Sequence, residues 1–147
     1  MIDRPIDEVW AFANDQFNRP RWSGDGNLGS RQTSPGPMAL GSILQSRTAI
    51  PILGFETRMD SVITEWDPPH AMTLSDTGRH SGPFRSAIVR MTMKAVPGGT
   101  RVVRIGDVKL RPAYRVLWLF LGPFVKRMMI RRNNLGTLKL LLEAEPE

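Results

Sequence analysis

The sequence contains no cysteine and only two histidines, and these absences exclude several kinds of chemistry. Without cysteine there are no disulfides, no thiolate metal ligands, no cysteine nucleophile and no thiol redox chemistry. His70 and His80 are expected at or near turns, and two isolated histidines do not make a metal site. A Gly-x-Ser-x-Gly nucleophile motif and a glycine-rich phosphate loop are also missing. We therefore expect no metal and no cofactor.

Long hydrophobic runs are also missing. The longest apolar segment covers residues 116–125 and is interrupted by Gly122 and Pro123. These residues reach only about half-way across a hydrocarbon core, which needs about 20 residues in a helix. The N-terminus is polar within three residues, so it is not a secretory signal. Cytoplasmic localisation is the default expectation.

Acidic residues are missing from one segment of an otherwise mixed chain. Lysine and arginine total 20 against 14 acidic residues, a net charge of +6, yet residues 111–142 hold seven basic and no acidic side chains. Such a segment can attract phosphates or anionic lipid headgroups, or it can be a solvated helix face. Nucleic-acid binding is disfavoured because the segment lacks exposed aromatic interleaving and any recognised motif.

The length of 147 residues and the hydrophobic fraction of 41% suit one globular domain covering residues 1–147. Glycine and proline clusters separate short β-like segments, which predicts an antiparallel meander. Alternation within these segments predicts one apolar face and one wet face, as in Ala87, Val89, Met91 and Met93 against Arg90. The predicted strands cover residues 40–50, 55–66, 71–75, 84–96 and 100–110.

Helical spacing appears at both ends of the chain. A first helix is predicted with Pro5 at its first position, and a short second helix is predicted to end near Ser23. After Pro112 the period predicts a long C-terminal helix interrupted near Gly122 and Pro123. Its apolar stripe comprises Phe124, Met128, Leu135, Leu138 and Leu142.

Five short motifs occur in a characteristic order along the whole chain. They are Arg4-Pro5-Ile6-Asp7-Glu8-Val9-Trp10, Asn18-x-Pro20-x-Trp22, Ile63-Thr64-Glu65-Trp66-Asp67-Pro68-Pro69, Gly99-Thr100-Arg101-Val102 and Leu135-x-x-Leu138-Lys139-x-x-Leu142-Glu143. In this order they resemble the SRPBCC or START-like superfamily, also called polyketide cyclase/dehydrase-like. The resemblance implies an α+β helix-grip fold, in which a curved antiparallel sheet wraps around a long C-terminal helix. An elongated cavity is then expected between sheet and helix.

One departure concerns the first strand. Members of the superfamily begin with a full strand, whereas only Met1-Ile2-Asp3 precede the first helix here. A missing edge strand leaves backbone groups unpaired. We expect local disorder, edge pairing between chains in a homodimer, or a substitute strand.

The resemblance implies that the cavity binds a hydrophobic small molecule, such as a lipid or a polyketide-like compound. Methionines on inward faces suit such a cavity because they adapt their shape, although ordinary core filling is the alternative. Arg131 lies within the apolar stripe, where it can hold a ligand carboxylate, pair with Asp76, or extend to the rim. The predicted ligand-binding residues are Leu44, Phe55, Met59, Ile63, Met72, Leu74, Asp76, Val89, Met91, Met93, Arg104, Phe124, Met128 and Arg131.

Two other functions remain open from the sequence. The first is a cyclase or dehydratase, in which an inward acid or His80 moves protons while Arg131 stabilises an enolate. The matched motifs are structural in the superfamily, so no catalytic residue carries over. The second is contact with an anionic membrane through Trp118, the apolar residues after it and the nearby basic residues, although a bent cavity lid is the alternative.

Overall fold

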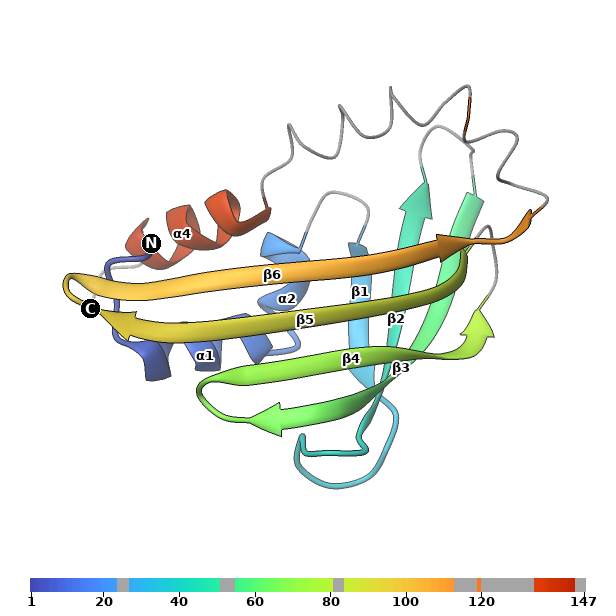
Figure 1. Ribbon diagram of the computed structural model, residues 1–147, viewed down its shortest axis with the longest axis horizontal. Coiled ribbons are helices and arrows are strands. Elements are labelled where there is room, and N and C mark those ends of the chain that lie inside the picture. The colour runs from blue at the N-terminus through green and yellow to red at the C-terminus, as the bar shows by residue number, and fades with distance from the viewer. Residues whose placement is uncertain (24–26, 51–54, 81–83, 113–118, 120–133, 145–147) are drawn as a thin grey trace.

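The computed structural model describes residues 1–23, 27–50, 55–80, 84–112, 119 and 134–144. Six strands form one antiparallel sheet in the order β1-β2-β3-β4-β5-β6, and each strand pairs with its neighbour in sequence (Figure 1). The strands are β1 (Asn27–Gln32), β2 (Ile43–Ile50), β3 (Phe55–Asp67), β4 (Ala71–His80), β5 (Phe84–Val96) and β6 (Gly99–Leu110), and the helices are α1 (Ile6–Asn14), α2 (Arg19–Trp22) and α4 (Asn134–Ala144). The predicted α+β class, the curved antiparallel meander and the C-terminal helix are confirmed.

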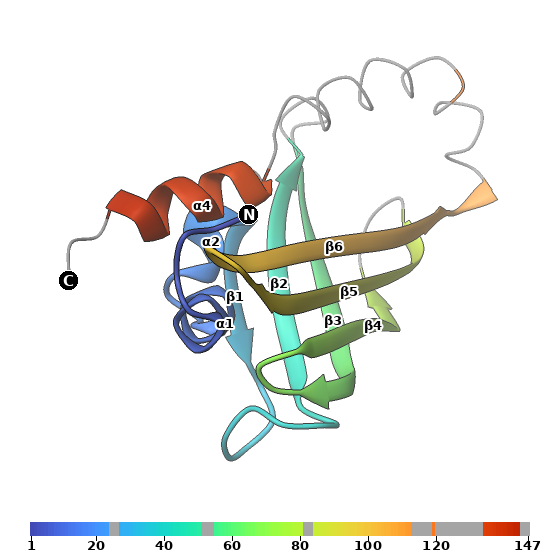
Figure 2. The same cartoon turned by 60° about the vertical axis from the view of Figure 1, so that its left-hand side comes forward.

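The helices α1, α2 and α4 gather at one end of the sheet (Figure 2). α1 packs on β5 and β6, while α2 packs against α1, β1 and α4. The core lies between these helices and the sheet, and its most deeply buried side chains include Val9, Leu44, Ile63 and Leu138. Burial of these apolar side chains is the main force that holds the helices on the sheet.

The strand register assigns each side chain to one face of the sheet. We call the helix-covered face the inner face. Across it, Leu44 pairs with Ser61 and Ser61 with Asp76, while Met72 pairs with Met91 and Met91 with Arg104. Residues opposite one another on adjacent strands point to the same side, so each set forms a row on the inner face.

The outer face carries charged pairs, as the alternation predicts, although Ile88, Val103 and Ile105 are exposed on it along β5 and β6. Arg47 Nη2 lies 2.8 Å from Glu56 Oε2, and Arg90 Nη2 lies 2.7 Å from Glu65 Oε1. These pairs join neighbouring or next-but-one strands across the solvent-facing surface. The contrast between Met93, which is buried, and Lys94, which is exposed, confirms the predicted alternation on β5.

The N-terminus joins the sheet through one residue. Ile2 and Thr100 exchange backbone hydrogen bonds of 2.9 and 2.8 Å and form an isolated antiparallel bridge. Ile2 is buried, and the Thr100 hydroxyl donates to the Arg4 carbonyl at 2.8 Å. The expected substitute strand is this single bridge in the described structure, while pairing between chains stays a prediction.

Several predicted boundaries are wrong. The strand β1 was not predicted, because Leu28 and its polar neighbours show no alternation. β4 continues to His80 instead of ending at Ser75, so His80 ends a strand instead of lying in a loop. Pro5 is the N-cap of α1 and precedes its first helical residue. Of the predicted long C-terminal helix, the structure describes α4, and most of the remainder lies outside the described residues.

Candidate functional site

The predicted ligand-binding residues on the strands share the inner face. Leu44, Ile63, Met72, Met91 and Met93 belong to the buried core beneath the helices. The others on this face are only partly buried: Met59, Leu74, Asp76, Val89 and Arg104. Phe55 begins β3, but its side chain lies outside the described part, as do Phe124, Met128 and Arg131. Their role as ligand contacts stays a prediction.

Burial of the inner face changes along β6. Thr100 is fully buried at 0% exposure, Val102 and Arg104 are partly buried, and Val108 is 49% exposed although it points to the same side. The described helices therefore cover the sheet up to about Arg104. Beyond this point the inner face carries Val89, Gly106 and Val108. Val89 on β5 lies directly opposite Gly106 on β6, and Val108 is the next residue of β6 on the same face. We call this exposed part the open half of the inner face.

Polar groups border the open half on β3 and β4. Thr57 and Ser61 are buried at 4% and 5% exposure, and Asp76 lies directly opposite Ser61. One carboxylate oxygen of Asp76 is buried. Buried oxygen-bearing side chains beside apolar ones are typical of sites that orient a mainly apolar ligand through a few polar contacts.

Two arginines from different elements meet beside a tryptophan. Arg104 from β6 places its guanidinium carbon 5.6 Å from the ring centroid of Trp22, which belongs to α2. This is within the range of a cation–π contact. Arg19 begins α2, and its Nη1 atom is buried without a hydrogen-bond acceptor among the described residues, as is Nε1 of Trp22. We call Arg19, Trp22 and Arg104 the arginine cluster.

The electrostatics of the arginine cluster are unfavourable for a structure without an anion. Burial and, second, the nearby positive charge of Arg104 lower the pKa of Arg19 to about 10. Burial also lowers the pKa of Arg104. Both side chains remain cationic at neutral pH, and neither forms an ion pair with any residue in the described ranges. Two partly desolvated like charges repel each other and favour a bound anion.

Sequence reasoning identified one member of this cluster. Arg104 is predicted because it shares the inward parity of Val102 and Val108, whereas Trp22 belongs to a structural motif and Arg19 stands at an unspecified position of that motif. α2 has four residues, too few for a periodic pattern to orient Arg19. The contact between Trp22 and Arg104 joins residues far apart in sequence, so only the tertiary packing shows it.

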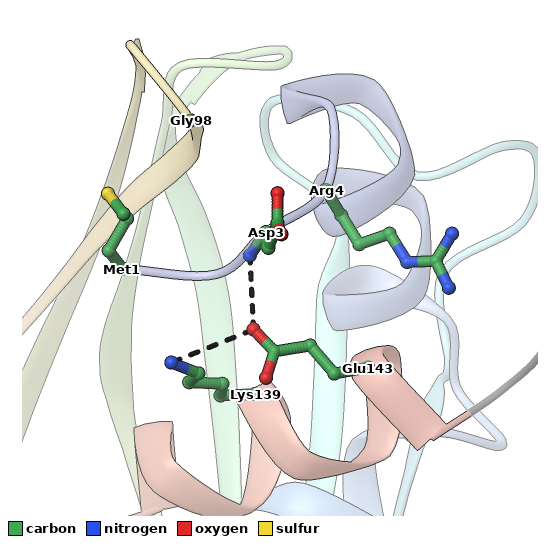
Figure 3. Close-up of a pocket in the computed structure, with 6 residues that line it drawn as sticks. All are labelled: Met1, Asp3, Arg4, Gly98, Lys139 and Glu143. Atoms are coloured by element: carbon green, nitrogen blue, oxygen red, sulfur yellow. Dashed lines mark hydrogen bonds and ion pairs between the residues drawn. The ribbon is translucent and has the colours of Figure 1, made fainter.

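A separate depression lies between the N-terminus, the β5–β6 turn and α4, away from the open half. It has a volume of about 600 Å³ and is lined by Met1, Asp3, Arg4, Gly98, Lys139 and Glu143 (Figure 3). Its polar groups already bind one another or the backbone: Glu143 Oε1 accepts the Asp3 N–H at 3.1 Å and lies 3.7 Å from Lys139 Nζ. It contains none of the predicted ligand-binding residues, and we do not take it as the functional site.

The described residues offer neither a metal site nor a membrane-spanning helix. No group of three or more histidine or acidic side chains there is placed to hold a metal ion. None of the helices in the described ranges is long and apolar enough to cross a membrane. The segment predicted to touch a membrane surface lies mostly outside the described residues, so membrane contact stays a prediction.

Comparison with known proteins identifies the family to which the sequence is similar. A family model described as "Polyketide cyclase / dehydrase and lipid transport" matches residues 1–143. No curated protein matches the chain.

Solved structures share the fold at low sequence identity. A protein from Chromobacterium violaceum is 14% identical with a TM-score of 0.67, and the alignment covers 99% of this chain and 94% of that one. A conserved protein from Geobacillus kaustophilus is 11% identical with a TM-score of 0.69, with 94% and 88% of the two chains covered. The di-domain ARO/CYC BexL from the BE-7585A biosynthetic pathway is 22% identical with a TM-score of 0.67 over 99% of this chain and 48% of that one.

Proposed function

The chain belongs to the polyketide cyclase/dehydrase and lipid transport family, and on this premise we propose that it binds a hydrophobic small molecule on the inner face of its sheet. The observation that carries the proposal is the change in burial along β6. The inner face is sealed by helices at Thr100 but 49% exposed at Val108. An exposed face of aliphatic side chains next to a closed core is suited to an apolar ligand.

Binding to this face is driven by removal of apolar surface from water. Val89 and Val108 supply branched aliphatic surface, and Gly106 leaves the backbone accessible between them. Each Å² of apolar surface buried contributes roughly 25 cal/mol before the costs of association are subtracted. The methionines at the border of the open half, Met59 and Met91, can adjust their shape to ligands of different outline.

A pair of charge substitutions on β6 tests the proposal. Val108→Glu places a carboxylate on the inner face, and Ile105→Glu places one on the outer face, where Ile105 is 65% exposed. Both positions are exposed, so both variants are expected to fold. A carboxylate in an apolar site must be desolvated when the ligand binds, so we expect Val108→Glu to weaken binding by about 10-fold or more.

The measurement combines two experiments. Native mass spectrometry of protein purified from its host is expected to show a co-purified apolar molecule, and titration with a fluorescent fatty-acid analogue gives the affinity. Ile105→Glu is expected to bind as the wild type does. Equal loss in the two variants, or no binding of any apolar compound by the wild type, would contradict the proposal.

A cyclase or dehydratase activity is the second candidate, and Asp76 favours it. Its carboxyl group lies opposite Ser61 on the inner face, with one oxygen buried, where it can exchange a proton with a bound ligand. On this hypothesis Asp76→Asn removes turnover of a poly-β-ketone analogue while leaving its affinity within about 3-fold of wild type. Unchanged turnover in Asp76→Asn would contradict a role for this carboxyl group.

A further inference from the structure

We propose that Arg19 and Arg104, together with Trp22, bind the carboxylate headgroup of the apolar ligand. This inference rests on the proposed function and specifies the class of ligand as an apolar carboxylic acid. The site is assembled from α2 and β6, with the Trp22 ring 5.6 Å from the guanidinium carbon of Arg104. Its charge comes from two cations that have no carboxylate partner in the described ranges.

The cluster has more hydrogen-bond donors than acceptors. Nη1 of Arg19 and Nε1 of Trp22 are both buried without a hydrogen-bond partner in the part of the chain that the structure describes. A buried donor without an acceptor is costly, and native structures contain few of them. An anion with two oxygen atoms supplies the missing acceptors and neutralises the repulsion between the guanidinium groups at the same time.

The chain uses arginine differently where arginine has a structural role. On the outer face Arg47 and Arg90 bind Glu56 and Glu65 at 2.8 and 2.7 Å. The two arginines of the cluster are more buried than these, yet they have no acidic partner among the described residues. A buried arginine that stabilised the fold would require a partner more strongly than an exposed one does.

The surroundings indicate an apolar acid as the ligand. Arg104 is paired with Met91 in the sheet, and Val102 precedes it on the same face, so the cluster borders apolar surface. Further along β6 the same face carries Gly106 and then Val108 at about 13 Å from Arg104, given the rise per residue of a strand. A headgroup at Arg104 therefore directs an attached apolar body along the open half. The planar guanidinium group matches a carboxylate in two-point geometry.

The test compares ligands that share a tail and differ in headgroup. Dodecanoate and dodecanol are titrated by isothermal calorimetry into the wild type and into Arg19→Met, Arg104→Met and Arg101→Met. Arg101 is the matched control, because it lies on the same strand as Arg104 but is exposed on the outer face. We expect the wild type to prefer dodecanoate by about 10-fold or more, the gain typical of charge-assisted hydrogen bonds. This preference should disappear in Arg19→Met and Arg104→Met and persist in Arg101→Met.

Three results would overturn the inference in distinguishable ways. Equal binding of acid and alcohol by the wild type rejects the carboxylate site and leaves the proposed function intact. Failure of both compounds to bind rejects the inference and the proposed function together. Binding of inorganic phosphate as tightly as dodecanoate rejects the apolar acid as the ligand.

Thermal unfolding separates a ligand-binding arginine from a structural one. Arg19→Met removes a buried cation that has no ion pair with any described residue, so its melting temperature without ligand is expected to equal or exceed that of the wild type. Arg19→Lys keeps the charge but not the planar donor pair, and it should retain only part of the preference for dodecanoate. A marked fall in the melting temperature of both variants, with loss of dodecanol binding, would identify a structural role and overturn the proposal.

Discussion

Replacing Gly99 with alanine tests how the N-terminus is attached to the sheet. Gly99 has a φ of +133°, and a Cβ atom built there would lie 2.1 Å from the carbonyl oxygen of Ile2 and 3.0 Å from the Cα of Asp3. Both contacts are with backbone, which cannot rotate away as a flexible side chain can. Alanine at this position therefore has to push Ile2 away from Thr100.

The expected loss in the free energy of unfolding has two parts. Any substitution at a positive φ would show the first part, and only this site shows the second. Backbone strain at such a φ costs about 1–3 kcal/mol. Displacing Ile2 also breaks the two backbone hydrogen bonds to Thr100, each worth about 1 kcal/mol net. It exposes a side chain that is now 3% exposed, at up to about 2 kcal/mol. We expect a site-specific loss of about 2–4 kcal/mol, a large part of the roughly 5–15 kcal/mol that stabilises a typical domain.

Gly98→Ala provides the control, because Gly98 also has a positive φ of +82° but a Cβ there would meet only Met1 Cε at an ordinary 3.8 Å. Urea unfolding followed by tryptophan fluorescence gives the free energy of unfolding of both variants. The difference between them isolates the contact with Ile2. If Gly99→Ala lost no more stability than Gly98→Ala, the attachment of Ile2 to Thr100 would not contribute to stability as described.

Two further predictions concern α4 and an outer-face carboxylate. Leu138→Ala, at a position with 0% exposure, is expected to cost about 2–5 kcal/mol in urea unfolding, whereas Leu140→Ala, at 71% exposure, should stay within about 0.5 kcal/mol of wild type. Equal effects would contradict the packing of α4 against α1 and α2. The hydrogen bond from Thr73 and, second, the one from Arg90 lower the pKa of Glu65. The ionised carboxylate therefore stabilises the fold at pH values above its ordinary pKa of 4.5, and this contribution is lost as the pH falls and the carboxylate is protonated. Glu65→Gln should lose less stability than the wild type between pH 5 and pH 3 in urea unfolding, and an unchanged pH dependence would refute this.

The strands with clear alternation were predicted closely from sequence. β5 covers the predicted residues 84–96, and β6 begins one residue earlier than predicted, at Gly99. The errors occur where the local signal is weak. β1 has a glycine and few apolar residues, so its pairing depends on β2, and the end of β4 is held by pairs such as Asp76 with Ser61. Strands that form mainly through pairing with a neighbouring strand need not show alternation in their own sequence, so the sequence alone does not predict them.

For the candidate site, the sequence predicted only which face of the sheet each strand residue occupies. Alternation placed Met91 and Arg104 on one face, and the register now shows them as direct partners. The same reasoning had no means of bringing α2 over β6, because that depends on how the helices pack against one another. Arg19 illustrates the limit, since its burial is set by neighbours from other elements and a four-residue helix gives no periodic signal.

The uneven cover over the inner face divides two tasks along the length of the same strands. Val102, near the helices, packs against the core, while Val108, six positions further along β6, is 49% exposed. On the proposed function, substitutions at the far end alter which molecules are accepted with little effect on folding. A lineage built on this architecture could then diversify its ligands, because the residues proposed to contact the body of the ligand lie apart from most of those that keep the chain folded.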